Sequence, residues 1–131
     1  MSIRYIVTPK KDPRNPDATP KFYMMTKSFA AVDRDFLIKD MVNHTSLTAQ
    51  EAATGIDYLF EVIPKYIFLG FTVQIGKLGY FTVAIKSEGS DTEKEATADK
   101  IKRKRLVFVV GKDIRKKINE FPAERYDKKD L

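Results

Sequence analysis

The pattern of apolar and polar side chains predicts three strands in the second half of the chain. Successive side chains of a strand point to opposite faces, so an alternation of apolar and polar residues is typical of a half-buried strand. Residues 71–75 alternate in this way, residues 78–86 follow as a longer strand, and residues 101–109 form a third that is basic in its first half and apolar in its second. Gly76 and Lys77 provide a turn between the first two segments, and the polar residues 87–100 connect the second and third. We therefore expect a three-stranded sheet with a long second hairpin.

A further hairpin is expected at the N-terminal end. Residues 3–8 and 21–27 contain the β-branched and aromatic side chains that favour strands. Four prolines lie between them and exclude a helix or a paired strand there. The segment Arg14-Asn15-Pro16 lies in this loop, where a proline-rich turn is the simplest interpretation.

Two helices are predicted between the hairpin and the sheet. The first spans about residues 33–44, with Asp33 as N-cap. The second begins after a capping box formed by Thr48 and Glu51, and Gly70 is suited to end it. A short third helix is expected over residues 111–118, followed by a frayed polar tail at 121–131.

The second helix is apolar around most of its circumference. Its polar stripe is narrow, whereas a helix in a small domain normally has one apolar side. Apolar residues on two flanks require a second layer, and a chain of 131 residues has few elements to supply it. A partner subunit is the simplest source of that layer.

The third strand of the sheet is the most informative segment. Lys102, Lys104, Leu106 and Phe108 share one face, and Ile101, Arg103, Arg105, Val107 and Val109 share the other. Such a strand is anchored in a core at one end and leaves the body at the other. An external polyanion is the natural partner for a ribbon with cations on both sides. The alternative is a solvated edge strand whose charges only deter aggregation.

Charge is distributed unevenly along the chain, which has a net charge of +6. Residues 86–117 contain eleven basic and six acidic side chains, and residues 1–32 contain six basic and two acidic ones. Residues 33–70 contain three basic and six acidic side chains. The positive charge thus gathers in the predicted strands and the last helix, which favours nucleic acid as a partner.

Several classes of function find no support in the composition. The chain has no cysteine and a single histidine, His44, which is better suited to end the first helix than to bind a metal. No nucleophile–base pair or glycine-rich phosphate loop is present, so we expect no enzyme activity, cofactor or metal. No apolar run is long enough for a membrane span and the N-terminus lacks a signal-peptide pattern, so we expect a cytoplasmic protein.

The order of these elements resembles the HU/IHF family of bacterial histone-like DNA-binding proteins. The resemblance covers about Phe36 to Ile118. Leu78-Gly79-Tyr80-Phe81-Thr82-Val83 is similar to the family's Phe-Gly-x-Phe-x-Val turn and strand. Phe108-Val109-Val110-Gly111-Lys112 is similar to the Phe-x-Pro-Gly-Lys segment that precedes the last helix. The N-terminal hairpin resembles that of an extended HU-like variant from Bacteroides-type bacteria.

The resemblance implies an α+β fold: two N-terminal helices, a three-stranded antiparallel sheet with a protruding hairpin arm and a short C-terminal helix, here with an extra N-terminal β-hairpin. We expect a single HU-like domain over 1–131. Its parts are a hairpin extension (1–30), a helical dimerisation body (33–69), a sheet and arm (71–110), a C-terminal helix (111–120) and a tail (121–131).

The family also implies an intertwined dimer that grips double-stranded DNA through the phosphate backbone and the minor groove. The expected DNA-binding residues are the cations of the arm and of the last helix: Lys86, Lys100, Lys102, Arg103, Lys104, Arg105, Lys112, Arg115 and Lys116. The free amides at Gly111 and Lys112 are expected to add a phosphate contact. The expected dimer interface comprises apolar residues of the second helix and the sheet: Ile56, Leu59, Phe60, Ile63, Phe81 and Phe108.

Two departures from the family pattern leave a second interpretation open. Residues 87–100 contain five acidic side chains, two lysines and no proline, whereas family arms carry an Arg-Asn-Pro tip. Val110 replaces the proline before the last helix. An Arg-Asn-Pro tripeptide does occur at residues 14–16, where a wedge inserted into a DNA groove is the alternative to a proline-rich turn.

We therefore weigh two hypotheses. The first is a homodimeric, largely sequence-independent, nucleoid-associated architectural protein that condenses DNA. The second is an HU-fold dimeric protein–protein interaction module with weak or no DNA binding, which uses the N-terminal hairpin or the acidic arm tip.

Overall fold

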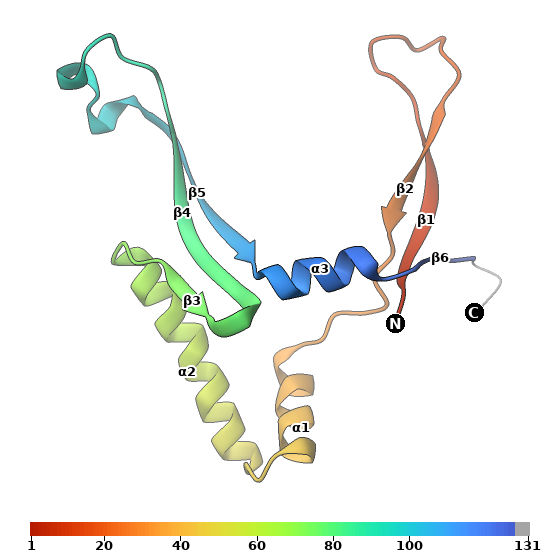
Figure 1. Cartoon of the computed structure of the whole chain (residues 1–131), viewed down its shortest axis with the longest axis vertical. Coiled ribbons are helices and arrows are strands. Elements are labelled where there is room, and N and C mark those ends of the chain that lie inside the picture. The colour runs from red at the N-terminus through yellow and green to blue at the C-terminus, as the bar shows by residue number, and fades with distance from the viewer. Residues whose placement is uncertain (128–131) are drawn as a thin grey trace. The chain divides into compact units, whose positions relative to one another are not determined.

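The computed structural model describes residues 1–127 and divides the chain into two compact units. One unit comprises residues 33–116, and the other comprises residues 1–32 together with the C-terminal segment from 117 onward. In the described part, three α-helices and two three-stranded sheets make a mixed α+β structure (Figure 1). None of these helices is both long and apolar enough to span a membrane.

Two helices open the larger unit, and both start as predicted. Asp33 caps α1 (Arg34–His44), and its carboxylate accepts the backbone N–H of Phe36. Thr48 and Glu51 form the capping box of α2 (Ala49–Phe68). Helix α1 packs against α2, and Gly70 leaves α2 with a φ of 92°, a left-handed conformation that glycine adopts without strain.

The sheet of the larger unit has the order β3-β4-β5. Strand β3 (Val73–Ile75) pairs only with the first three residues of β4 (Gly79–Ser87), whereas β5 (Ile101–Val110) pairs along all of β4. Beyond Phe81 the sheet is therefore a two-stranded ribbon (Figure 1). We call the hairpin from Phe81 to Phe108 the arm, and residues 88–100 within it the arm loop.

Two glycines close the base of the arm. Gly79 has a φ of 144°, and a Cβ there would lie 2.1 Å from the carbonyl oxygen of Val109. A Cβ on Gly111 would lie 2.1 Å from the carbonyl oxygen of Lys77. The Gly111 amide also donates a hydrogen bond to the Leu78 carbonyl, 2.9 Å away. The turn before β4 and the end of β5 therefore approach too closely for any larger residue.

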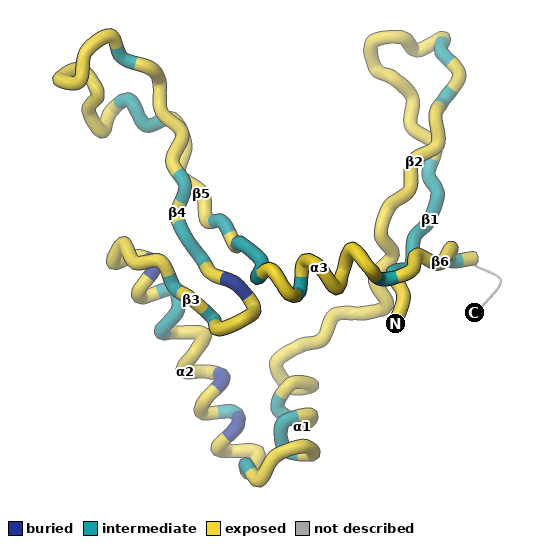
Figure 2. The backbone as a smooth tube through the Cα atoms, in the orientation of Figure 1, coloured by how far each residue is buried: buried dark blue, intermediate teal, exposed yellow. Residues whose placement is uncertain are grey.

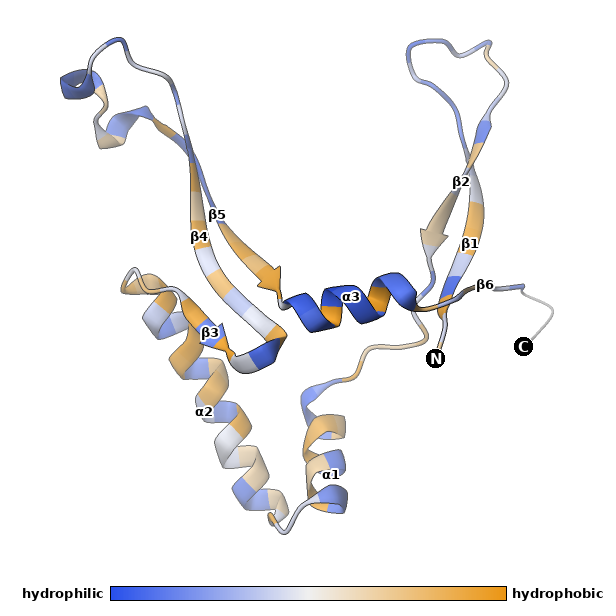
Figure 3. Ribbon diagram, in the orientation of Figure 1, coloured by the Kyte–Doolittle hydropathy of each residue, from blue (hydrophilic) through white to orange (hydrophobic). Residues whose placement is uncertain are grey.

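The arm loop contains no regular strand. It includes two short 3₁₀ turns, at Glu93–Glu95 and Ala98–Lys100, and is predominantly hydrophilic (Figure 3). A β-bulge lies where the loop joins the ribbon: Lys86 pairs with Arg103, but Ser87 pairs with Ile101, so Lys102 has no partner in the ladder.

The smaller unit contains a second sheet, with the order β2-β1-β6. Strands β1 (Ile3–Lys10) and β2 (Lys21–Thr26) form the predicted antiparallel hairpin. The C-terminal strand β6 (Ala123–Arg125) pairs with β1 in parallel. The prediction of a frayed tail at 121–131 is therefore wrong for residues 123–125, because this short segment pairs with a distant strand. Residues 128–131 lie outside the described part.

The last helix, α3 (Lys112–Glu120), continues from the larger unit into the smaller one. Ile114 of α3 is half-buried, but Ile118 is 46% exposed, so α3 buries little of its apolar side within this chain.

The hydrophobic core of the single chain is very small. Among the described residues, only Ala52, Ile56 and Ile67 of α2 are buried apolar side chains. Figure 2 shows most of the backbone as exposed. Phe68 at the end of α2 is 85% exposed and Phe60 is 56% exposed. The chain alone leaves large apolar side chains in water, a condition that normally marks an interaction surface.

Candidate nucleic-acid interface

The pairing of β4 with β5 gathers three cations on one face of the arm. Ala84 lies opposite Arg105, and Lys86 lies opposite Arg103. Directly opposed residues of an antiparallel pair share a face, and so do residues two positions apart. Lys86, Arg103 and Arg105 therefore make one cationic face with the small side chain of Ala84 among them.

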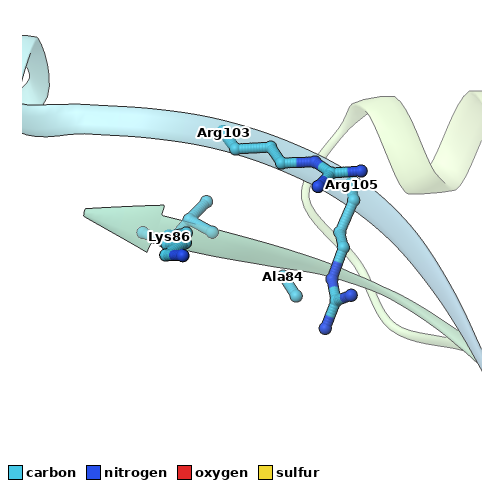
Figure 4. Close-up of a pocket in the computed structure, with 5 residues that line it drawn as sticks. Ala84, Lys86, Arg103 and Arg105 are labelled. Carbon is cyan, nitrogen blue, oxygen red and sulfur yellow. The ribbon is translucent and has the colours of Figure 1, made fainter. Parts of the chain in front are cut away.

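This cationic face borders a groove of about 400 Å³ that is lined by Ala84, Ile85, Lys86, Arg103 and Arg105. Figure 4 shows Arg105 extending from β5 past Ala84 of β4, with Lys86 and Arg103 farther along the arm. The small Ala84 leaves space beside the guanidinium. A groove of this kind presents several N–H donors and positive charges to an anion.

The three cations of this face are free of ion pairs within residues 1–127. All three side chains belong to exposed residues. Lys102 differs, because its ammonium lies 3.5 Å from a carboxylate oxygen of Glu88. Of the four consecutive basic residues 102–105, only Lys102 therefore has a carboxylate partner in the described part of the chain.

The opposite face of the arm is mainly apolar. Phe81 pairs with Phe108, Val83 with Leu106, and Ile85 with Lys104. The rings of Phe81 and Phe108 have centroids 4.7 Å apart, and Ile85 is 61% exposed. Lys104 is the single cation among these pairs. The expected ribbon with cations on both sides is thus a ribbon with one cationic face and one apolar face, because β4 contributes Lys86 to the first face and valine and isoleucine to the second.

The remaining predicted DNA-binding residues lie outside this face. Lys100 is half-buried at the end of the arm loop, and its carbonyl accepts the amide of Glu88. Lys112, Arg115 and Lys116 lie on the first turns of α3, where they are exposed. The expected phosphate contact by the Gly111 amide is not available, because that amide already donates to Leu78.

The predicted dimer residues differ in exposure. Leu59 and Phe60 are exposed on α2, Ile63 is half-buried, and Ile56 is buried within its own chain. The expected dimer interface does not include three exposed apolar side chains at the end of α2 and just after it: Phe68, Leu69 and Phe71. Their position beside Gly70, where the helix stops, is the signal that would have identified them.

Titratable side chains do not assemble into a metal site. Within the described residues, no group of three or more histidine, aspartate or glutamate side chains is placed to hold a metal ion. His44 contacts Asp40 one helical turn earlier, through the backbone carbonyl at 2.8 Å and the carboxylate at 3.5 Å. His44 is the last residue of α1, and both of its contacts are within that helix.

Comparison with known proteins defines the family. Residues 1–125 match the family model HU-HIG, described as an HU domain fused to a wHTH, Ig, or glycine-rich motif. The chain belongs to this family of HU-like proteins, as the resemblance had indicated. No curated protein matches the chain.

A solved structure shares the fold. It is the structure of a protein from Bacteroides vulgatus ATCC 8482 that has been assigned as a bacterial DNA-binding protein. The TM-score is 0.61 at 14% sequence identity, and the match covers 95% of this chain and 47% of that chain. This chain therefore spans about half the length of that protein.

Proposed function

We propose that this protein is a dimeric architectural protein that binds duplex DNA through the arm with little regard to base sequence. The observation that carries the proposal is the cationic face: Lys86, Arg103 and Arg105 are exposed, adjacent and without carboxylate partners. Membership of the HU-like family supports DNA as the polyanion.

The mechanism is neutralisation of phosphates with release of condensed counterions. Cations on a two-stranded ribbon reach the phosphate backbone and the walls of the minor groove, and such contacts position a protein without reading bases. Lys104, Lys112, Arg115 and Lys116 add positive charge around the main site. The proposed location of the protein is accordingly with the bacterial chromosome. We propose no enzyme activity, since HU-like proteins are generally not enzymes.

The exposed apolar surface supports the proposed dimer. A chain that buries only three apolar side chains in its described part has a core too small to be stable alone. A second copy would cover Leu59, Phe60 and Phe68 along α2, together with the apolar face of the arm at Phe81 and Phe108. Sedimentation analysis of Phe60→Glu is expected to show monomers or unfolded chains, and a stable, folded monomer of the unaltered protein would contradict the dimer.

Salt-dependent binding tests the proposed DNA site. Fluorescence anisotropy with duplexes of two unrelated sequences would compare the unaltered protein with Arg103→Gln/Arg105→Gln. The slope of log K against log salt is expected to become shallower by about 1.8 for each chain that contacts DNA, since each phosphate contact contributes about 0.9. Both duplexes should lose affinity equally.

A matched control separates this site from general charge. Lys39→Gln/Lys65→Gln removes two exposed cations from α1 and α2 and changes the net charge by the same amount. It is expected to leave the slope nearly unchanged. An arm variant that behaves like this control, or that loses affinity for one sequence only, would refute the proposed mechanism.

The acidic arm loop favours one competing function, a protein–protein interaction module. Residues 87–100 contain five carboxylates and two lysines, so the net negative charge of the loop repels phosphate. In this alternative, partners captured by the protein survive nuclease treatment and are lost when Glu93 and Glu95 are changed to glutamine. Capture that disappears with nuclease supports the DNA-binding proposal instead.

A further inference from the structure

The N-terminal sheet repeats the division into faces seen in the arm. In the β1–β2 register, Lys10 lies opposite Lys21, and Thr8 lies opposite Tyr23. These four side chains therefore share one face, to which Arg4 and the pair Ile6–Met25 also belong by the two-residue period. The other face contains the pairs Val7–Met24 and Pro9–Phe22. The first face is thus basic at its loop end, beyond the apolar pair Ile6–Met25, and the second face is apolar.

The end of this hairpin places like charges directly opposite each other. Opposed cations on neighbouring strands destabilise a sheet unless an anion lies between them. Within residues 1–127, neither Lys10 nor Lys21 forms an ion pair, and the same is true of Lys11 and Arg14 in the adjoining loop. The opposed pair Lys10–Lys21 therefore destabilises this end of the hairpin, and no ion pair within residues 1–127 compensates for it.

A groove of about 580 Å³ lies at this point, with Lys10, Lys11, Lys21 and Tyr23 among its lining residues. The Lys10 ammonium is 5.7 Å from the centre of the Tyr23 ring, an attraction that orients it along this face. Asp12 also lines the groove, but one of its carboxylate oxygens accepts the Arg14 backbone N–H at 2.9 Å and so closes the local turn. Three lysines and one carboxylate leave the groove with an excess of positive charge.

We propose that the tip of the β1–β2 hairpin is a second binding site for the phosphate backbone of duplex DNA, distinct from the arm. Its principal contacts are Lys10, Lys11 and Lys21, and Arg14 extends the site along the loop. The cations are distributed along two strands and a loop, which suits a polymer with repeated phosphates better than a single small anion. The inference rests on the proposed function only for the identity of the polyanion.

The charges of the two hairpin loops favour DNA over an acidic protein. The arm loop is acidic, with five carboxylates and two lysines in residues 87–100, whereas residues 9–21 contain four basic and two acidic side chains. Phosphate is therefore repelled at the end of the arm and attracted at the end of the N-terminal hairpin. Each chain thus has one proposed binding surface on each of its two units, and each surface contributes its own phosphate contacts.

The test is a salt titration of duplex binding by five versions of the full chain, among them the unaltered protein and Arg103→Gln/Arg105→Gln. Lys10→Gln/Lys21→Gln removes the opposed cations, and Lys10→Arg/Lys21→Arg keeps their charge. Lys39→Gln/Lys65→Gln is the charge-matched control on the other unit. The glutamine variant is expected to lower the slope of log K against log salt by about 1.8, while the arginine variant and the control keep the slope of the unaltered protein.

The outcomes separate this inference from the proposed function. If only Arg103→Gln/Arg105→Gln reduces the slope, the arm binds DNA and the hairpin site is wrong. If only Lys10→Gln/Lys21→Gln reduces it, the hairpin site holds and the proposal for the arm fails. Equal losses of slope for the arginine and glutamine variants of the hairpin would show a structural effect and overturn the inference. Normal DNA binding by Lys10→Gln/Lys21→Gln, combined with weaker binding to poly-glutamate, would also overturn it, because it would assign the site to acidic proteins.

Discussion

The guanidinium of Arg34 donates two parallel hydrogen bonds to the carboxylate of Asp57, at 2.6 and 2.8 Å. Arg34 is the first residue of α1 and Asp57 lies in the middle of α2, so the pair ties the two helices together. The hydrogen bonds from Arg34 hold the pKa of Asp57 below its ordinary value, and the same interaction raises the pKa of Arg34. A bidentate pair of this kind fixes orientation as well as distance.

This ion pair predicts an acid-sensitive packing of α1 on α2. A carboxylate whose pKa is lower in the folded state contributes stability above its unfolded pKa of about 3.9, and that stability is lost as the pH falls through the folded pKa. Thermal unfolding between pH 7 and pH 2 should therefore show a smaller loss of stability for Asp57→Asn than for the unaltered protein. Glu61→Gln, on the same helix, serves as control; a pH profile of Asp57→Asn identical to that of the unaltered protein would contradict the coupling.

The close approach at the base of the arm predicts intolerance to a single methyl group. Gly79→Ala is expected to destabilise the fold by about 1–3 kcal/mol, because the new Cβ would meet the Val109 carbonyl and the backbone φ is positive. Gly89→Ala is the matched control, since nothing lies within 4 Å of a Cβ at that position. Urea unfolding of both variants measures the difference, and equal stabilities would show that the base of the arm is not held as described.

Ala84 predicts how the cationic face responds to an added carboxylate. In Ala84→Glu the new side chain lies opposite Arg105 and competes with phosphate for the guanidinium. Duplex affinity is expected to fall on the order of tenfold, which corresponds to about 1.4 kcal/mol. Ala96→Glu adds the same charge to the exposed arm loop and should weaken binding much less. Equal effects of the two substitutions would remove Ala84 and its neighbours from the DNA contact.

The arm loop predicts the opposite change. Glu93→Gln/Glu95→Gln removes two negative charges from the 3₁₀ turn of the loop, and duplex binding at low salt should become tighter because repulsion from phosphate decreases. The control is Glu61→Gln/Glu120→Gln, which changes the net charge equally on α2 and α3. Anisotropy at two salt concentrations tests the prediction. Unchanged affinity in the loop variant would place the loop away from DNA.

Features that depend on neighbours in sequence were predictable. Asp33 and the Thr48–Glu51 capping box fix the helix starts through hydrogen bonds that span three residues, and Gly70 ends α2 by its own backbone freedom. The strands of the N-terminal hairpin followed from β-branched and aromatic residues, and those of the arm from their patterns of apolar and basic side chains. The family followed from short motifs at the base of the arm, where Gly79 and Gly111 are required by contacts only a backbone can make.

Features that depend on pairing between distant segments were not predictable. Strand β6 has only three residues and joins β1 from the other end of the chain, so its sequence looks like a tail. The sidedness of the arm required the register of β4 against β5, which places Lys86 with Arg103 and Ile85 with Lys104. The pair Arg34–Asp57 joins residues far apart in sequence, and each carboxylate and guanidinium has many alternative partners before the chain folds.

Lys102, which has no partner in the β4–β5 ladder, marks a position where the arm tolerates a change of length. Ile101 already lies opposite Ser87, so deleting Lys102 alone leaves every ladder pair of β5 in place. Deleting Lys104 instead would move Arg103 to the side of the phenylalanines, because each one-residue slip turns a strand over. Related chains that vary in length at position 102 are therefore expected to keep the same orientation toward their ligand, whereas a change of length two residues further on would invert it.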